Sequence, residues 1–204
     1  QTCALPICLF NSLIDSLAGG NPAATLPALL MAIAYLVAML MLYTKQRKIV
    51  FNPNRNVAAL ADYQAPNGLS PVTNRTADGL EIVSWYLKPL RDDGQTIAYF
   101  HGNAGHHGDR VARIIPYAAE GYGILLAGYR GYGGNPGAPT EQGLYADARA
   151  ALDFLQNQGV GPDHLILFGE SLGSAVATQM AAWDETTKAV RIKGQPIRFS
   201  NRIH

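Results

Sequence analysis

The sequence predicts an α/β fold, a mostly parallel sheet with helices on both faces, preceded by one transmembrane helix. Three observations support this prediction. Short apolar runs alternate with helical segments over residues 71–183, as in parallel sheets that are covered on both faces. An uncharged stretch, residues 23–43, is long enough to span a bilayer. A G-x-S-x-G pattern stands where one apolar run meets a helix.

The composition is that of one domain with a hydrophobic core. The chain has 204 residues, of which 48% are apolar and 15% are charged, and this length is short for two domains. A formal net charge of +1 gives no electrostatic reason to expect nucleic acid as a partner. Both cysteines, Cys3 and Cys8, lie near the start of the chain, so we expect no disulfide, no Cys-ligated metal and no thiol nucleophile.

Residues 1–22 form an N-terminal segment that we leave out of the predicted domain. One choice of codons for residues 1–7 resembles a common sequencing-adapter sequence, so we expect these seven residues to be an artefact. The native start would then be lost or lie further along the chain, with Met31 as a candidate.

Residues 23–43, from Ala23 to Tyr43, are expected to anchor the protein in membrane lipid as a single span. No charged side chain occurs between Asp15 and Lys45, and a buried core helix, the alternative, rarely runs this long without one. No Ala-x-Ala-like cleavage site lies between residue 35 and the following cations, which favours an uncleaved anchor. Those cations, at positions 45, 47 and 48, favour the cytoplasmic side for the rest of the chain.

A juxtamembrane linker, residues 44–70, leads into the N-terminal part of the globular domain, residues 71–183. Strands are expected where apolar runs are bounded by turn residues, at residues 81–87, 96–100, 123–127 and 164–168. Helices are expected over residues 110–120, over residues 140–158 with Thr140 as the N-cap, and from Ser171 onward.

The first chemical motif is G-E-S-L-G at residues 169–173, between the last expected strand and the helix after it. A serine on such a sharp turn lifts its hydroxyl clear of the sheet, and flanking glycines let strand and helix approach closely. The N–H of Leu172, at the positive end of the helix dipole, would stabilise a developing oxyanion. The pattern predicts Ser171 as the catalytic nucleophile, with Gly169 and Gly173 supporting its turn; a plain turn is the alternative.

The second motif is H-G-N-A-G at residues 101–105, directly after an expected strand. An early loop of this kind supplies the second oxyanion donor. We assign this role to the N–H of Asn103, with His101 and Gly102 supporting the loop. Because both donors are backbone groups, changes to the side chains of Asn103 and Leu172 are expected to matter little. An ordinary glycine-rich turn is the alternative.

Other polar residues are interpreted as structural. The loop Y-R-G-Y-G-G at residues 129–134 either walls the cleft or packs rigidly on the sheet edge, and we give Arg130 no chemical role. His106 and His107 are expected at a helix start, because they lack the spacing of a zinc site. Three aspartates are expected to be solvated positions on helices: Asp109, Asp147 and Asp153. We expect no metal.

Five segments, taken in order, resemble the membrane-anchored α/β-hydrolases that carry an HGN loop. They are Q-R-K at residues 46–48, D-G-L at residues 78–80 leading to W-Y at residues 85–86, H-G-N-A-G, Y-R-G-Y-G-G-N-P-G and G-E-S-L-G. The resemblance implies an α/β-hydrolase fold, no cofactor, and cleavage of an ester, thioester or amide in a small-molecule, lipid or acyl substrate through an acyl-serine. Gly128 departs from the pattern, because many such hydrolases have an acidic residue there.

The end of the chain departs further from this pattern. The fold places the triad acid and histidine after the nucleophile, yet residues 184–204 form an atypical tail in which no buried strand is expected. We therefore expect the triad acid and histidine to be absent from these 204 residues and this fragment to be inactive. A non-catalytic, membrane-tethered binding module with the same fold is the alternative function.

Overall fold

The computed structural model describes residues 11, 15, 22–183, 189–192 and 195–198. The chain divides into two compact units, residues 1–49 and residues 50–204. The predictions for residues 1–7 and for most of the tail fall outside the described residues.

A single long helix, α2 (Pro22–Val50), dominates the described part of the first unit. It contains the predicted anchor, and large apolar side chains are exposed along it from Leu26 to Tyr43. The stretch Leu26–Gln46 is long and apolar enough to cross a membrane, because a helix of that length spans about 30 Å. The sequence prediction of one apolar spanning-length helix is confirmed.

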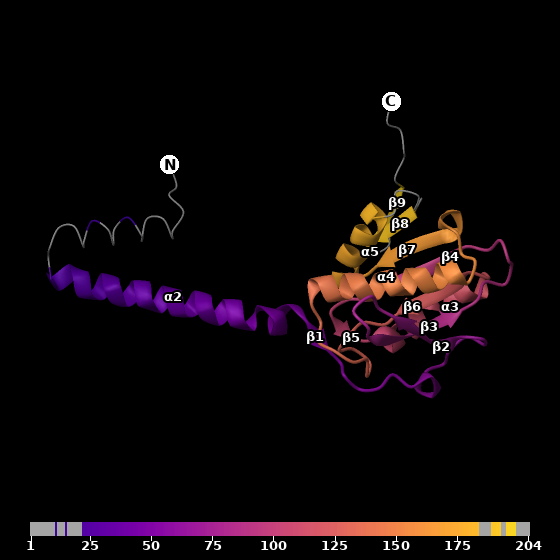
Figure 1. Ribbon diagram of the computed structural model, residues 1–204, viewed down its shortest axis with the longest axis horizontal. Helices are drawn as coiled ribbons and strands as arrows, with labels where there is room; N and C mark the ends of the chain where they lie inside the picture. The colour runs from indigo at the N-terminus through magenta and orange to yellow at the C-terminus, as the bar shows by residue number, and fades with distance from the viewer. Residues whose placement is uncertain (1–10, 12–14, 16–21, 184–188, 193–194, 199–204) are drawn as a thin grey trace, which may run out of the picture. The chain divides into compact units, whose positions relative to one another are not determined.

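The second unit is built on a seven-stranded sheet in the order β2-β3-β6-β4-β7-β8-β9 (Figure 1). Its strands are β2 (Ser70–Arg75), β3 (Glu81–Leu87), β4 (Thr96–Phe100), β6 (Gly123–Ala127), β7 (Leu165–Gly169), β8 (Ala189–Ile192) and β9 (Gln195–Arg198). The central strands β6, β4, β7 and β8 are parallel. Antiparallel pairs at both edges complete the mostly parallel sheet that the sequence predicts.

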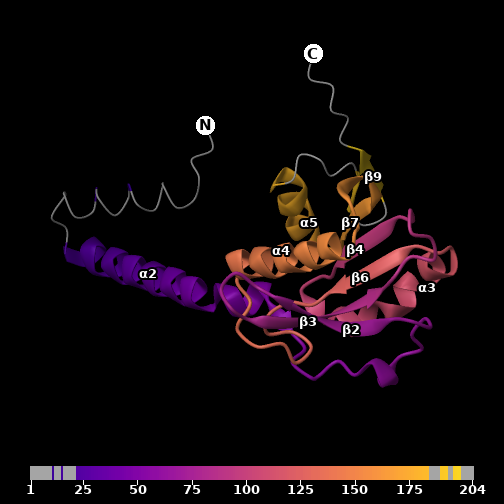
Figure 2. The same cartoon turned by 45° about the vertical axis from the view of Figure 1, so that its right-hand side comes forward.

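Helices cover both faces of this sheet (Figures 1 and 2). Side chains alternate along β4, where Phe100 packs in a core cluster with α4 (Glu141–Asn157) and α5 (Leu172–Trp183). Tyr99 packs in a second cluster with α3 (Val111–Ala119). Thr140 is the N-cap of α4, since its Oγ1 accepts a hydrogen bond of 3.0 Å from the N–H of Gly143, as predicted.

Short elements complete the described fold. Three 3-10 helices are present, η1 (Leu60–Asp62), η2 (His107–Arg110) and η3 (Pro162–His164). His106 caps η2 as the sequence predicts for a helix start, and its N–H donates to Asp109 Oδ2 over 2.9 Å. A small parallel pair joins β1 (Asn52–Pro53) to β5 (Ala104–Gly105).

The tail contains a strand, which corrects the prediction that none follows α5. β8 pairs in parallel with β7, with Leu167 opposite Val190 and Gly169 opposite Ile192, and β9 then pairs antiparallel with β8. Backbone pairing does not require the continuous apolar run on which the prediction relied. The edge of β7 is therefore covered rather than open.

Asp147 corrects a second prediction, because it is buried rather than solvated. Its side chain is 1% exposed, and its carboxylate accepts from the backbone N–H and the guanidinium of Arg130, each at 2.8 Å. Arg130 also donates to Asp78 over 2.7 Å. The buried carboxylate is tolerated because these charge-assisted bonds compensate its lost hydration. The contact between Arg130 and Asp147 holds the start of the loop after β6 against α4.

Candidate active site

The carboxyl ends of β4, β6 and β7 meet at one edge of the sheet, because these strands are parallel neighbours. The predicted site residues lie at the carboxyl ends of β4 and β7, in the segments that follow them, and at the start of α5. In an open α/β sheet this edge is the usual place for a ligand.

Ser171 lies at the sharp turn between β7 and α5, and it is exposed. Its φ angle is +52°, and among the described residues no other non-glycine has a positive φ. That conformation costs on the order of 1–3 kcal/mol, and such strain is concentrated at functional sites. The turn is fixed by short bonds, since the N–H of Gly173 donates to Glu170 O over 2.9 Å and that of Ser174 donates to Ser171 O over 2.8 Å.

The two flanking glycines are required by close backbone approach. A Cβ on Gly169 would lie 2.5 Å from the carbonyl oxygen of Gly173. A Cβ on Gly173 would lie 2.0 Å from Phe100 O and 2.7 Å from His101 O. The turn therefore rests directly on the backbone at the end of β4, which explains the predicted supporting role of both glycines.

The loop after β4 lies against the same turn. A Cβ on Gly102 would be 3.3 Å from Glu170 O and 3.4 Å from Ser171 Cβ, and the N–H of Glu170 donates to Phe100 O over 3.0 Å. The structure thus brings Gly102 and Ser171 together. Leu172 is the first residue of α5, a position whose N–H has no intrahelical acceptor.

Asn103 has its other polar groups engaged outside the turn. Its carbonyl oxygen accepts from the N–H of Asn52 over 3.3 Å and from the Tyr132 hydroxyl over 3.2 Å. Its side-chain amide donates to Val50 O over 3.1 Å. From the sequence, changes to this side chain were expected to matter little, because its partner Val50 is distant along the chain and the bond could not be foreseen.

His101 is completely buried and acts as a support. Its Nδ1–H donates to Gly102 O over 2.7 Å, and its ring packs on Tyr129 and Tyr132 with centroids 4.3 and 5.2 Å away. Burial lowers the pKa of His101 to about 3, so the imidazole is neutral at physiological pH. The two tyrosines pack as the structural interpretation of their loop predicts.

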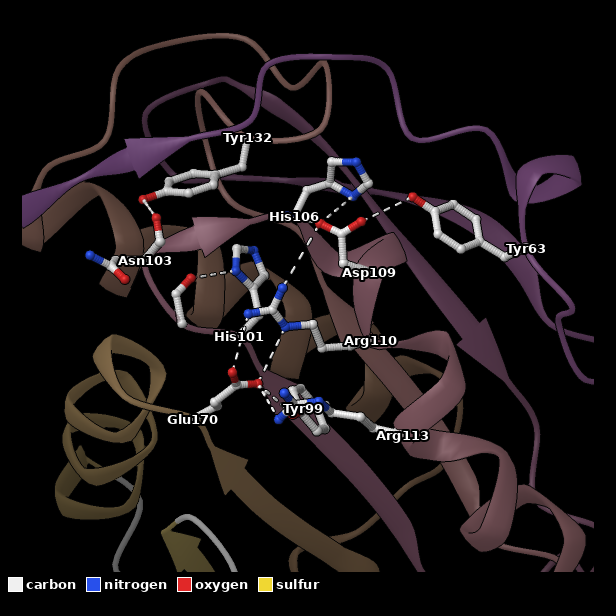
Figure 3. A network of polar contacts seen from close by, with 11 residues as sticks. Tyr63, Tyr99, His101, Asn103, His106, Asp109, Arg110, Arg113, Tyr132 and Glu170 are labelled. Carbon is white, nitrogen blue, oxygen red and sulfur yellow. Dashed lines mark hydrogen bonds and ion pairs between the residues drawn. The ribbon is translucent and has the colours of Figure 1, made fainter.

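A charged network surrounds Glu170, the residue before Ser171 (Figure 3). Its carboxylate accepts from the Tyr99 hydroxyl over 2.7 Å and from the guanidinium of Arg110 over 3.2 Å. Arg113 makes an ion pair with it, also at 3.2 Å. Burial alone would raise the pKa of Glu170, but the bonds from Tyr99 and Arg110 bring it below the ordinary value. Burial and the carboxylate together raise the pKa of Tyr99 to about 12.

Sequence reasoning missed this network, because the second residue of G-x-S-x-G is variable and its partners are distant in the chain. A signal was nevertheless present. Arg110 and Arg113 are three residues apart at a helix start, a spacing that places both side chains on one face. The two ion pairs join η2 and α3 to the turn that carries Ser171.

Three of the four described histidines make contacts with residues other than Ser171, and the fourth, His164, ends η3 before β7, at the opposite end of that strand from Ser171. His101 bonds to Gly102, while the His107 ring packs edge-on against Trp85 with centroids 4.9 Å apart. The Nδ1 of His106 lies 3.9 Å from Asp109 Oδ2. Within the described residues, no group of three His, Cys, Asp or Glu side chains could hold a metal ion.

Sequence comparisons show a similarity of this region to a known family. Residues 95–190 match the family model of the alpha/beta hydrolase fold. An uncharacterized protein of Mycobacterium tuberculosis is 39% identical over 155 residues, which cover 74% of this chain and 55% of that protein. Protein bem46 of Schizosaccharomyces pombe is 29% identical over 156 residues, 72% of this chain and 52% of that protein. The chain spans about half the length of these curated relatives.

A further relative matches over a shorter stretch, and two solved structures share the fold. Lysophosphatidylserine lipase ABHD12 of Danio rerio is 37% identical over 98 residues, 47% of this chain and 25% of that protein. An esterase of Pyrococcus furiosus is similar with a TM-score of 0.55 and 20% identity, covering 69% of this chain and 54% of that chain. The epoxide hydrolase of Aspergillus niger is similar with a TM-score of 0.52 and 23% identity, covering 67% of this chain and 37% of that chain.

Proposed function

We propose that this chain is part of a hydrolase that cleaves an ester, thioester or amide through an acyl intermediate on Ser171, since residues 95–190 match the model of the alpha/beta hydrolase fold. The observation that carries the proposal is the positive φ of Ser171. The strain is maintained by packing between α5 and the end of β4, as expected where the geometry of a nucleophile must be fixed.

In the proposed reaction, the Ser171 hydroxyl attacks the carbonyl carbon while a base takes its proton. The N–H groups of Leu172 and Asn103 stabilise the oxyanion, and one such donor is worth about 2.7–4 kcal/mol. Collapse of the tetrahedral intermediate expels the alcohol, thiol or amine and leaves an acyl-serine. Water then attacks this ester, releases the acid and restores the hydroxyl.

The base in this proposal is an imidazole from outside the described residues. The described histidines support other contacts, and burial lowers the pKa of both His101 and His107 to about 3. A serine hydroxyl is a poor nucleophile without a positioned base. We therefore propose that the 204-residue chain alone retains at most the residual catalysis of an oxyanion hole, roughly 10³–10⁴ over water.

We also propose that α2 tethers the enzyme to a membrane as a single span, and that the substrate is a small molecule, a lipid or another acyl compound. The length and apolar character of Leu26–Gln46 support the tether. The lipase name of the Danio rerio relative supports an acyl-lipid substrate. The cations at positions 45, 47 and 48 favour the cytoplasmic side for the catalytic unit.

Labelling with a fluorophosphonate probe tests the nucleophile. In the full-length gene product, Ser171→Ala should abolish labelling, since loss of such a nucleophile lowers turnover by up to about 10⁶. Thr178→Ala is the matched control, because Thr178 is exposed on the same helix and bonds to Ser174 O. The 204-residue chain should label far more slowly than the full-length product.

Undiminished labelling of the Ser171→Ala protein would exclude this serine as the nucleophile. A full-length product that is folded but neither labelled nor active on any short-chain ester would instead favour the alternative, a membrane-tethered binding module. The absence of a base beside Ser171 within the described residues is the observation that keeps this alternative open.

A further inference from the structure

The segment that leaves α2 is bonded to the loop that follows β4. β1 runs parallel to β5, with Asn52 opposite Ala104. The N–H of Asn52 donates to Asn103 O over 3.3 Å, and the N–H of Asn54 donates to Gly105 O over 3.4 Å. The Asn103 side chain returns a bond of 3.1 Å to Val50 O. Three hydrogen bonds therefore connect residues 50–54 to residues 103–105.

The same segment also contacts the loop after β6. The N–H of Gly133 donates to Asn54 O over 2.8 Å, and the N–H of Ala58 donates to Gly133 O over 3.2 Å. Tyr132, one residue earlier, donates to Asn103 O. Residues 50–58 thus tie the loop after β4 to the loop after β6.

The loop after β4 needs such a connection to hold one conformation. It contains Gly102 and Gly105, and Gly105 has a φ of +75°. Glycine reaches this φ easily but also populates many other conformations, so the residue does not by itself fix the loop. A two-residue strand pair is too short to be stable by itself. An oxyanion donor must nevertheless be fixed before the reaction, because misplacement by about 1 Å costs about a hundredfold in rate.

We propose that residues 50–54 are a positioning element of the active site, and that the Asn103 side chain is the positioning residue through which they hold the oxyanion donor. The inference rests on the proposed function of Ser171 and Asn103. Val50 is both the last residue of α2 and the acceptor of the Asn103 bond. The last residue of α2 therefore also belongs to the proposed positioning element.

The test uses the full-length gene product in detergent micelles and a short-chain p-nitrophenyl ester. Asn103→Ala removes the bond to Val50, and Asn54→Pro removes the donor to Gly105. Ala59→Pro is the control, because Ala59 is exposed, has a φ of −93° and lies beyond the paired segment. Turnover, KM, the rate and final extent of fluorophosphonate labelling, and the thermal midpoint are measured for each protein.

A positioning role predicts that each of the two variants lowers kcat at least tenfold while KM stays within about twofold, because an oxyanion donor acts in the transition state. Labelling should slow but still reach completion, since Ser171 is intact. The fold-decrease in kcat of the double variant should be smaller than the product of the two single fold-decreases, because both bonds hold the same loop. The control should behave like the wild type.

Unchanged kcat in folded Asn103→Ala protein, with an active wild type, would overturn this inference and leave the proposed function standing. If Asn54→Pro fails to fold, Asn103→Ala decides alone. A parallel fall of the thermal midpoint with kcat restored at lower temperature would also overturn it, because this is the behaviour of a purely structural contact. A wild type that is neither active nor labelled overturns the proposed function and this inference together.

Discussion

Two buried histidines are expected to make the folding stability depend on pH. The described histidines His101 and His107 are almost fully excluded from solvent, and burial lowers the pKa of each to about 3. An unfolded histidine titrates near 6.5. Between these values the unfolded chain binds more protons than the folded one, so stability falls as the pH falls from about 6.5 towards 3.

His107→Phe should make the free energy of unfolding fall less steeply as the pH is lowered. The phenyl ring keeps the edge-on packing against Trp85 and removes one group that contributes up to about 1.4 kcal/mol per pH unit. Thermal unfolding of the detergent-solubilised protein between pH 7.5 and pH 4.5 measures the difference. Equal slopes for the two proteins would show that His107 does not contribute to acid lability.

Ser171 and Glu170 differ in how far the sequence could predict them. The sharp turn at Ser171 was predictable because strand, serine and glycines form one short local pattern. Glu170 was not, since its partners Tyr99 and Arg110 are brought to it only by the pairing of β4 with β7. Asn103 lies between these cases, because its backbone role follows from the motif while its side-chain bond to Val50 is non-local.

At the scale of elements, contact between α5 and β4 fixes the nucleophile turn. Gly173→Ala should destabilise the protein by about 1–3 kcal/mol, because the added Cβ would lie 2.0 Å from Phe100 O. This cost exceeds the gain of about 0.5–1 kcal/mol that alanine brings within a helix.

Gly161→Ala is the matched control for this prediction. Nothing lies within 4 Å of the position that its Cβ would occupy, and its φ is not positive. We therefore expect its thermal midpoint to stay at or slightly above the wild-type value. Equal midpoints for Gly173→Ala and Gly161→Ala would contradict the close approach of α5 to β4.

Elements with strong local patterns were predictable, and those made by pairing alone were not. β4 and β6 are continuous apolar runs, and α4 has both a cap and an apolar face. β8 has the sequence A-V-R-I, with a charge inside it, and only its register with β7 identifies it as a strand. The glycine at position 128 also could not be explained from the sequence. A Cβ there would lie 2.0 Å from Val83 O, on a strand that is distant in sequence.

For the whole molecule, α2 predicts behaviour as a membrane protein. After an alkaline carbonate wash, the full-length product should remain in the membrane pellet, because Leu26–Gln46 can span the apolar core of a bilayer. A version that begins at Val50 should move to the supernatant. Release of the intact protein by carbonate would exclude a spanning helix, and protease protection in sealed vesicles reports the side of the catalytic unit.

The general architecture of the molecule was predictable, but the connection between its parts was not. A mostly parallel sheet follows from apolar strands that alternate with helices. The pairing of β1 with β5 joins residues about fifty positions apart and involves only two residues on each side, so no periodicity reveals it.

The position of β1 also determines what proteolysis would release. A protease that cuts the full-length protein between Gln46 and Val50 would free a soluble product that keeps β1 bonded to its loop. A cut after Arg55 would leave β1 on the fragment that carries α2. The released fragment could then keep the loop after β4 in place only while the two fragments stayed associated. If the proposed function holds, shedding at neighbouring sites would thus give one product that keeps its activity on dilution and another that loses activity as its fragments separate.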